Sequence, residues 1–118
     1  MPLQVPGVIF RPIHLKPFYS VGKGEQLQGV QVHITDYAKA PLSPIQFLVM
    51  QEVARLWPER AVFDHADKGR FSMFDKVCGS HQIRERFSQN NRWEDIRPYW
   101  EKDVENFRQL SKKYHLYR

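Results

Sequence analysis

Gln28-Gly29-Val30-Gln31-Val32-His33-Ile34-Thr35-Asp36 alternates between apolar and polar side chains through its middle part. This alternation predicts a β-strand, because successive side chains of a strand point to opposite faces. The apolar residues Val30, Val32 and Ile34 are expected to face the core. The opposite face carries an amide, an imidazole and a hydroxyl about 6.7 Å apart. These three side chains either line a groove or simply face water: Gln31, His33 and Thr35.

A first strand is predicted upstream, at residues 8–16, where β-favouring residues are bounded by Gly7 and Pro17. Pro12 has no N–H to give to a neighbouring strand, so this strand should be an edge strand or a bulged one. In the connection that follows, two glycines flank Lys23. Their spacing predicts a mobile turn and not a phosphate-binding loop, which needs a longer spacing and a Lys-Ser or Lys-Thr ending.

A helix is predicted after the second strand. Ser43-Pro44-Ile45-Gln46 has the pattern of a capping box with proline at the first helical position, and Trp57-Pro58 closes the segment. Its spacing of apolar residues predicts a core-facing side made of Ile45, Leu48, Val49, Val53 and Leu56. The short apolar run Ala61-Val62-Phe63 suggests a third strand.

Two short helices are expected next. Ser72-Met73-Phe74-Asp75 has a second capping pattern, in which Asp75 takes a capping role, and Gly79 is placed to end that helix in the left-handed conformation. Ser80 is placed to cap the following helix, whose apolar residues are Ile83 and Phe87.

A last helix is predicted from Asn91, with apolar residues spaced by three and four as far as Tyr114. Pro98 lies inside this pattern and predicts a kink, or a break after which a long helix begins at Pro98. Residues 114–117 are expected to leave the helix and pack back on the domain.

The order of these elements favours an α+β fold, because strands come first and helices later without regular alternation. We expect one domain over residues 1–118, with a small, mainly antiparallel sheet packed against three or four helices. A chain of 118 residues and 14.1 kDa is long enough to bury a core. Its composition, 42% hydrophobic and 26% charged, excludes the disordered and low-complexity classes.

The charge and cysteine content set further limits. The formal net charge is +5, but the cations form no run and neither half of the chain is a basic tail. A nucleic-acid-binding domain is therefore the least favoured of the functions considered. The one cysteine, Cys78, excludes an internal disulfide and a cysteine-based zinc site. No segment resembles a signal peptide or a membrane span.

No self-contained catalytic constellation is found in the sequence. The five histidines show none of the spacings of a zinc site, so neither a metal nor a cofactor is expected. A nucleophile elbow is missing, and most carboxylates fall on predicted helices, where charge usually marks the solvated side. The residues therefore describe a domain that contributes a surface.

Several strings of residues together resemble one family. They are residues 3–12, Phe18 with Gly24-Glu25, residues 29–36, and the closing Lys113-Tyr114-His115-Leu116-Tyr117, joined by the following shorter matches in the same order: Phe74-Asp75-Lys76, Gly79-Ser80, Ile83-Arg84-Glu85, and Trp100 with Phe107. Together they are similar to the C-terminal domain of the exo-β-N-acetylmuramidases, which are bacterial peptidoglycan hydrolases. The resemblance covers nearly the whole chain.

The resemblance implies a glycoside hydrolase that removes terminal N-acetylmuramic acid from peptidoglycan fragments. In that family a larger, N-terminal, Rossmann-like domain carries the catalytic carboxylate, and the cleft lies between the two domains. This chain would be the accessory domain, with that larger domain and a muramic-acid-containing sugar as its partners, and it would not be catalytic alone. Family members are expected outside the cytoplasm or in the periplasm, whereas no targeting signal is recognised in this chain itself.

The resemblance also directs attention to the polar residues of the predicted strands. Gln31, His33, Thr35 and Asp36 become candidates for the wall of the sugar cleft, with His33 first. Arg11 or Lys23 could meet the lactyl carboxylate of muramic acid through a charge-assisted contact. One alternative stays open, in which the chain is a stand-alone carbohydrate-binding or peptidoglycan-binding module without catalysis.

Overall fold

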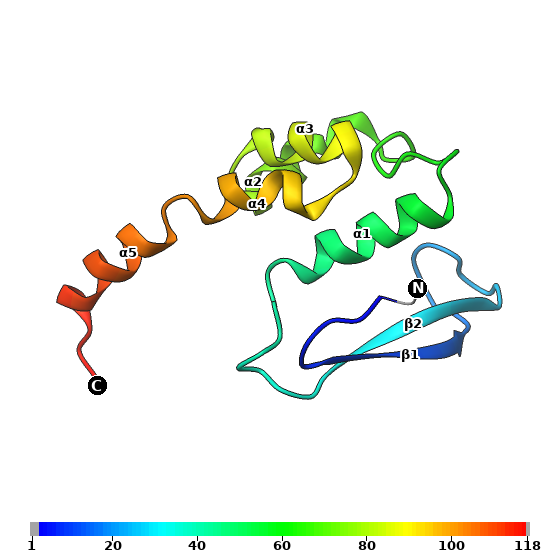
Figure 1. Ribbon diagram of the computed structural model, residues 1–118. Helices are drawn as coiled ribbons and strands as arrows, with labels where there is room; N and C mark the ends of the chain where they lie inside the picture. The colour runs from blue at the N-terminus through cyan, green and yellow to red at the C-terminus, as the bar shows by residue number, and fades with distance from the viewer. Residues whose placement is uncertain (1–2, 118) are drawn as a thin grey trace. The chain divides into compact units, whose positions relative to one another are not determined.

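The computed structural model describes residues 3–117, which fall into two compact units, Met1–Ser43 and Pro44–Arg118 (Figure 1). The first unit contains two strands, β1 (Val8–Leu15) and β2 (Leu27–Ile34). The second contains the helices α1 (Ile45–Leu56), α2 (Phe71–Cys78), α3 (His81–Asn90), α4 (Trp93–Glu101) and α5 (Val104–Ser111), together with the short 3₁₀ turns η1 (Lys68–Arg70) and η2 (Lys112–Tyr114). The predicted α+β class is confirmed, with strands first and helices after them.

The strands form an antiparallel two-stranded sheet within the described part of the chain. The register pairs Val8 with Ile34 at one end and Leu15 with Leu27 at the other. Pro12 lies opposite Val30 in this register. In a sheet of two strands each strand is an edge, so the proline can be accommodated as the sequence predicted.

The turn that enters the hairpin depends on Gly7. Its φ angle is +71°, and its carbonyl oxygen accepts hydrogen bonds from the backbone N–H groups of Thr35 and Asp36, at 2.8 and 3.2 Å. A Cβ atom at this position would lie 2.4 Å from the Asp36 carbonyl oxygen. A residue with a side chain therefore does not fit here.

Burial of the sheet is concentrated near this turn. Val5 and Val8 are buried, whereas Val30 and Val32 remain 60% and 45% exposed. The prediction that Val30 and Val32 face a core is therefore wrong for this structure. The physical reason is that, among the described residues of this unit, the hairpin has no second layer to cover its surface.

The core of the helical unit is largely aromatic. Its fully buried side chains are Phe47, Ile83, Phe87 and Ile96, with Trp93 almost as deep. The Phe47 ring is central, because its centroid lies 5.3 Å from that of Trp100 and 5.7 Å from that of Trp93. Ile83 and Phe87 were predicted as the apolar side of their helix, and their burial confirms it.

The predicted core-facing side of α1 was correct only in part, because Leu48 packs against the core. Phe47 is fully buried, whereas three of the expected core residues are exposed: Val49, Val53 and Leu56. This helix carries apolar residues around most of its circumference, so spacing by three and four could not select one side. Only tertiary packing does so.

Several predicted helix boundaries were also wrong. The structure shows no side-chain capping bond at the start of α1 within the described residues, and α2 begins at Phe71, which places Ser72 and Asp75 inside the helix. Ala61-Val62-Phe63 forms no strand and leads into a turn. There Phe63 packs edge-on against Phe74, with centroids 5.1 Å apart, so aromatic packing accounts for its apolar character.

The junction between α2 and α3 was predicted correctly. Gly79 ends α2 with a φ angle of +80°, and the Ser80 side chain accepts a hydrogen bond from the N–H of Gln82 at the start of α3. The last helix differs from its prediction. α4 continues through Pro98, and the break comes later, at Lys102 and Asp103.

The residues after η2 do not pack back on the domain, which corrects another prediction. Leu116 and Tyr117 are 88% and 89% exposed.

Among the described residues, no helix is long and apolar enough to cross a membrane.

Candidate functional site

The hairpin brings together three of the candidate site residues. Arg11 on β1 lies directly opposite Gln31 on β2, and Ile9 lies opposite His33. Paired residues of antiparallel strands point to the same face, with Cβ atoms about 5 Å apart. Arg11, Gln31 and His33 therefore share one face of the sheet, which we call the hairpin polar face. All three are exposed.

This face offers a guanidinium, an amide and an imidazole to solvent. The guanidinium can donate two parallel hydrogen bonds to a carboxylate, while the amide and the imidazole can each donate and accept. Hydroxyl and N-acetyl groups of a sugar need such mixed partners. The arrangement can bind a ligand, but it holds no carboxylate that could perform acid or base chemistry.

Thr35 and Asp36 lie just past the end of β2. Their backbone N–H groups donate to the Gly7 carbonyl oxygen. The Asp36 carboxylate accepts a hydrogen bond from the N–H of Ala38 at 3.0 Å and pairs with Lys39 at 3.1 Å. Asp36 therefore stabilises the turn that follows β2, which accounts for an acidic residue there without a ligand. Thr35 is exposed next to this turn.

Lys23 lies in the connection at the other end of the hairpin. Its turn is closed by the N–H of Gly24, which donates to the Pro17 carbonyl oxygen at 2.9 Å. From Leu27, where β2 begins, to Gln31, the nearest member of this face on β2, is about 13 Å along the strand. The structure therefore does not bring Lys23 together with the hairpin polar face.

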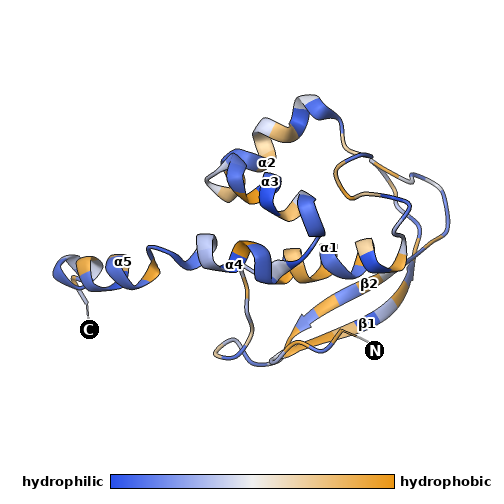
Figure 2. Ribbon diagram, turned by 45° about the horizontal axis from the view of Figure 1, so that its top comes forward, coloured by the Kyte–Doolittle hydropathy of each residue, from blue (hydrophilic) through white to orange (hydrophobic). Residues whose placement is uncertain are grey.

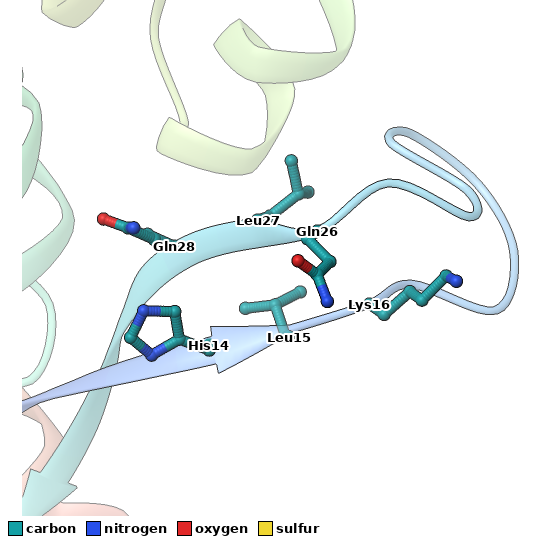
Figure 3. A pocket seen from close by; sticks show the side chains of 6 residues that line it. All are labelled: His14, Leu15, Lys16, Gln26, Leu27 and Gln28. Carbon is teal, nitrogen blue, oxygen red and sulfur yellow. The ribbon is translucent and has the colours of Figure 1, made fainter.

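A hollow of about 500 Å³ lies at the loop end of the hairpin (Figure 3). It is lined by residues from both strand ends and the adjoining loop: His14, Leu15, Lys16, Gln26, Leu27 and Gln28. Sequence reasoning missed this hollow. The sequence held only part of the signal, because His14 and Lys16 are two residues apart, as are Gln26 and Gln28. The register that sets His14 opposite Gln28 comes from the structure.

The least exposed ion pair of the described residues lies in the helical unit and has a structural role. The Arg84 guanidinium on α3 donates two hydrogen bonds, of 2.8 and 2.9 Å, to the Asp75 carboxylate on α2. These bonds hold the pKa of the Asp75 carboxyl below its ordinary value of 3.8. Arg84 also lies over the Phe71 ring, 4.8 Å from its centroid. The pair therefore joins α2 to α3.

This pair predicts a loss of stability on the acid side. A carboxyl whose pKa is lowered in the folded protein stabilises it above the unfolded value, and that contribution is lost as the pH falls through the folded pKa. The free energy of unfolding should therefore drop below about pH 4, and Asp75→Asn should lower it at pH 7 while flattening the acid limb. Urea unfolding from pH 2 to pH 7 measures both effects. Asp64→Asn, at an exposed loop position, is the control, and an equal change in both variants would contradict the prediction.

No nucleophile or metal site emerges from the described residues. Burial raises the pKa of the Cys78 thiol, which makes it a poor nucleophile at neutral pH. Between residues 3 and 117, no three His, Cys, Asp or Glu side chains lie close enough together to hold a metal ion.

Comparison with known proteins gives a consistent picture. The sequence model of the family described as "Exo-beta-N-acetylmuramidase NamZ, C-terminal" matches residues 1–117. The chain is 31% identical, over 98% of its length, to the peptidoglycan β-N-acetylmuramidase NamZ of Bacillus subtilis, of which it spans 27%. It is also similar to the 1.65 Å crystal structure of a DUF1343 family protein from Bacteroides fragilis, at 74% identity and a TM-score of 0.93, covering 97% of this chain and 30% of that one.

Proposed function

Because this chain belongs to the family of C-terminal domains of the exo-β-N-acetylmuramidase NamZ, we propose that it is the accessory, cleft-forming domain of an enzyme that removes terminal N-acetylmuramic acid from peptidoglycan fragments. The observation that carries the proposal is the family match over residues 1–117, essentially the whole chain. The curated relative it matches is named for the same class of activity.

The partners of the carboxylates in this chain support the proposed division of labour between two domains. Two of its carboxylates already have partners within the domain, Asp75 in Arg84 and Glu105 in Arg108 and Gln109. The catalytic carboxylate would then come from a larger, Rossmann-like N-terminal domain. In both relatives, the part beyond the match to this chain is more than two thirds of the protein, which is ample for such a domain.

The hairpin polar face supplies the proposed sugar contacts. Arg11 would pair with the lactyl carboxylate, the group that distinguishes N-acetylmuramic acid from N-acetylglucosamine. Gln31 and His33 would hydrogen-bond the hydroxyls or the N-acetyl group. Support for this comes from the register, which sets the three side chains side by side on exposed strand positions with no carboxylate among them.

The test uses the two-domain protein, in which this domain is joined to its larger partner. His33→Ala should lower kcat/KM on a substrate with terminal N-acetylmuramic acid about tenfold, as expected for one lost hydrogen bond. His65→Ala, at an exposed loop position, is the matched control. Unchanged kcat and KM in the His33 variant would remove this residue from the cleft, and absence of hydrolysis by the unmodified protein would refute the proposed activity.

A stand-alone binding module remains the second candidate, favoured by the hollow lined by His14, Lys16 and Gln28 (Figure 3). Such a module would bind muropeptides without any larger domain. Calorimetric titration of the 118-residue chain with muropeptides separates the two candidates. Micromolar binding would favour the module, and binding only by the two-domain protein would favour the accessory role.

A further inference from the structure

The junction of α4 and α5 carries a continuous apolar surface. We call it the α4–α5 surface and define it by Tyr99, Trp100, Val104, Phe107 and Leu110. Two adjacent hollows, of about 360 and 370 Å³, share Tyr99, Trp100 and Lys102 in their walls. The second hollow continues along α5 to Val104 and Phe107. The surface therefore combines an exposed helix face with a depression into which another surface can fit.

α5 itself is amphipathic and largely unsupported. Val104, Phe107 and Leu110 are 45%, 68% and 51% exposed, and they fall on one side of the helix at spacings of three. The other side is polar, where the Gln109 amide donates to the Glu105 carboxylate at 2.7 Å. The main contacts of α5 among the described elements are with η2. Figures 1 and 2 show it extending away from α2, α3 and α4, with hydrophobic and hydrophilic residues mixed along its length.

An eight-residue helix with this exposure is not stable by itself in water. Yet the crystal structure of the Bacteroides fragilis protein superposes on this chain with a TM-score of 0.93 over 97% of its length. A score that high requires most of the arm of residues 102–117 to follow the same path there. The extended arm therefore belongs to the fold, and an apolar partner surface is needed to keep it ordered.

We infer that the α4–α5 surface docks on the larger N-terminal portion of the same polypeptide. This inference rests on the proposed function, because it needs that portion to be present. Linkage favours this occupant over a second copy, since a covalently joined surface is available at millimolar effective concentration. This chain covers 30% of the Bacteroides fragilis protein, so most of that protein lies outside the match.

Two cations next to Tyr99 indicate which charges the partner surface should carry. The Arg86 and Lys102 side chains both lie over the Tyr99 ring, 4.7 and 4.3 Å from its centroid. The Tyr99 hydroxyl lies 3.1 Å from the Ser80 hydroxyl, and this hydrogen bond lowers the pKa of the phenol, together with the nearby cations. The docked surface should therefore be apolar at its centre and carry carboxylates at the rim that meets Arg86 and Lys102.

The experiment places a photo-crosslinking phenylalanine analogue at position 107 of the two-domain protein. After irradiation, mass spectrometry should find the crosslink within one polypeptide, between position 107 and the N-terminal portion. The same analogue at Gln109, on the polar side of α5, is the matched control and should give at least tenfold less of that product. A crosslink to a second copy, a crosslink confined to this domain, or equal yields from both positions would each overturn the inference.

A second variant guards against a local effect of the bulky analogue. Phe107→Ser should lower the midpoint of thermal unfolding of the two-domain protein by about 3 °C, because a docked ring loses its contacts. Gln109→Ser should leave the midpoint unchanged, and equal midpoints for the two variants would count against docking. Neither readout depends on hydrolysis. If the protein crosslinks as expected but does not cleave its substrate, the docking inference stands and only the proposed activity is refuted.

Discussion

Phe47→Ala is expected to reduce the free energy of unfolding by about 4 kcal/mol, within the range found for truncation of a buried phenylalanine. The ring is fully buried, and its centroid lies within 5.7 Å of those of Phe87, Trp93 and Trp100. These residues come from α1, α3 and α4, so one cavity would loosen three helices at once. Since small domains are stable by only about 5–15 kcal/mol, this loss should remove a large share of the stability of the helical unit.

Urea unfolding followed by tryptophan fluorescence measures this loss directly, because Trp93 and Trp100 lie against the Phe47 ring. Phe18→Ala is the matched control. Phe18 is 88% exposed, so the same chemical change there should alter the free energy of unfolding by less than about 0.5 kcal/mol. A loss below about 1 kcal/mol in the Phe47 variant would mean that the aromatic cluster is not the core of this unit.

The second large effect is expected at Gly7. Gly7→Ala should destabilise the hairpin by about 3 kcal/mol, combining the cost of a positive φ angle with a clash. The new Cβ would meet the Asp36 carbonyl oxygen at 2.4 Å and the Ala40 nitrogen at 3.0 Å. Both are backbone atoms, which cannot rotate away. The hydrogen bonds from Thr35 and Asp36 to the Gly7 carbonyl oxygen would be strained as well.

Hydrogen exchange of the β1 and β2 amide groups is the measurement, since it reports on the hairpin separately from the helical unit. Gly24→Ala serves as the control. Gly24 has a similar φ angle of +80°, but a Cβ there meets nothing within 4 Å. It should therefore cost about 1 kcal/mol, from the backbone conformation alone. Equal acceleration of exchange in both variants would show that the contact with Asp36 does not matter.

Local signals in the sequence predicted those parts of the fold that local physics decides. The alternation of residues 30–35 predicted β2, and Gly79 with Ser80 predicted the α2–α3 junction, because a left-handed residue and a capping side chain act within a few residues. The register that joins Arg11 to Gln31 was not predictable, since it depends on how an eleven-residue connection (16–26) closes. Sequence reasoning therefore selected these two candidates without knowing that they are neighbours.

Other predictions failed where packing overrides local pattern. Phe47 is absent from the predicted core because α1 has apolar residues on most sides. The aromatic partners that bury it lie far along the chain, from Phe74 on α2 to Trp100 on α4. The sequence predicts a kink or a break at Pro98; α4 passes through this residue without a break and ends at Glu101. A proline at this position removes one hydrogen bond and crowds the carbonyl group of Glu94, and the burial of Trp93 and Ile96 holds the helix around it.

The start of α4 has a consequence for how the helical unit assembles. No side chain next to Trp93 caps α4 within the described residues, but the Trp93 N–H donates to the Gln51 side chain of α1 at 2.9 Å, from 42 residues away along the chain. This hydrogen bond at the first turn of α4 can form only after α1 has packed against α4. Nucleation of this helix is therefore a non-local event, and α1 and α4 should appear together in the folding transition rather than one after the other.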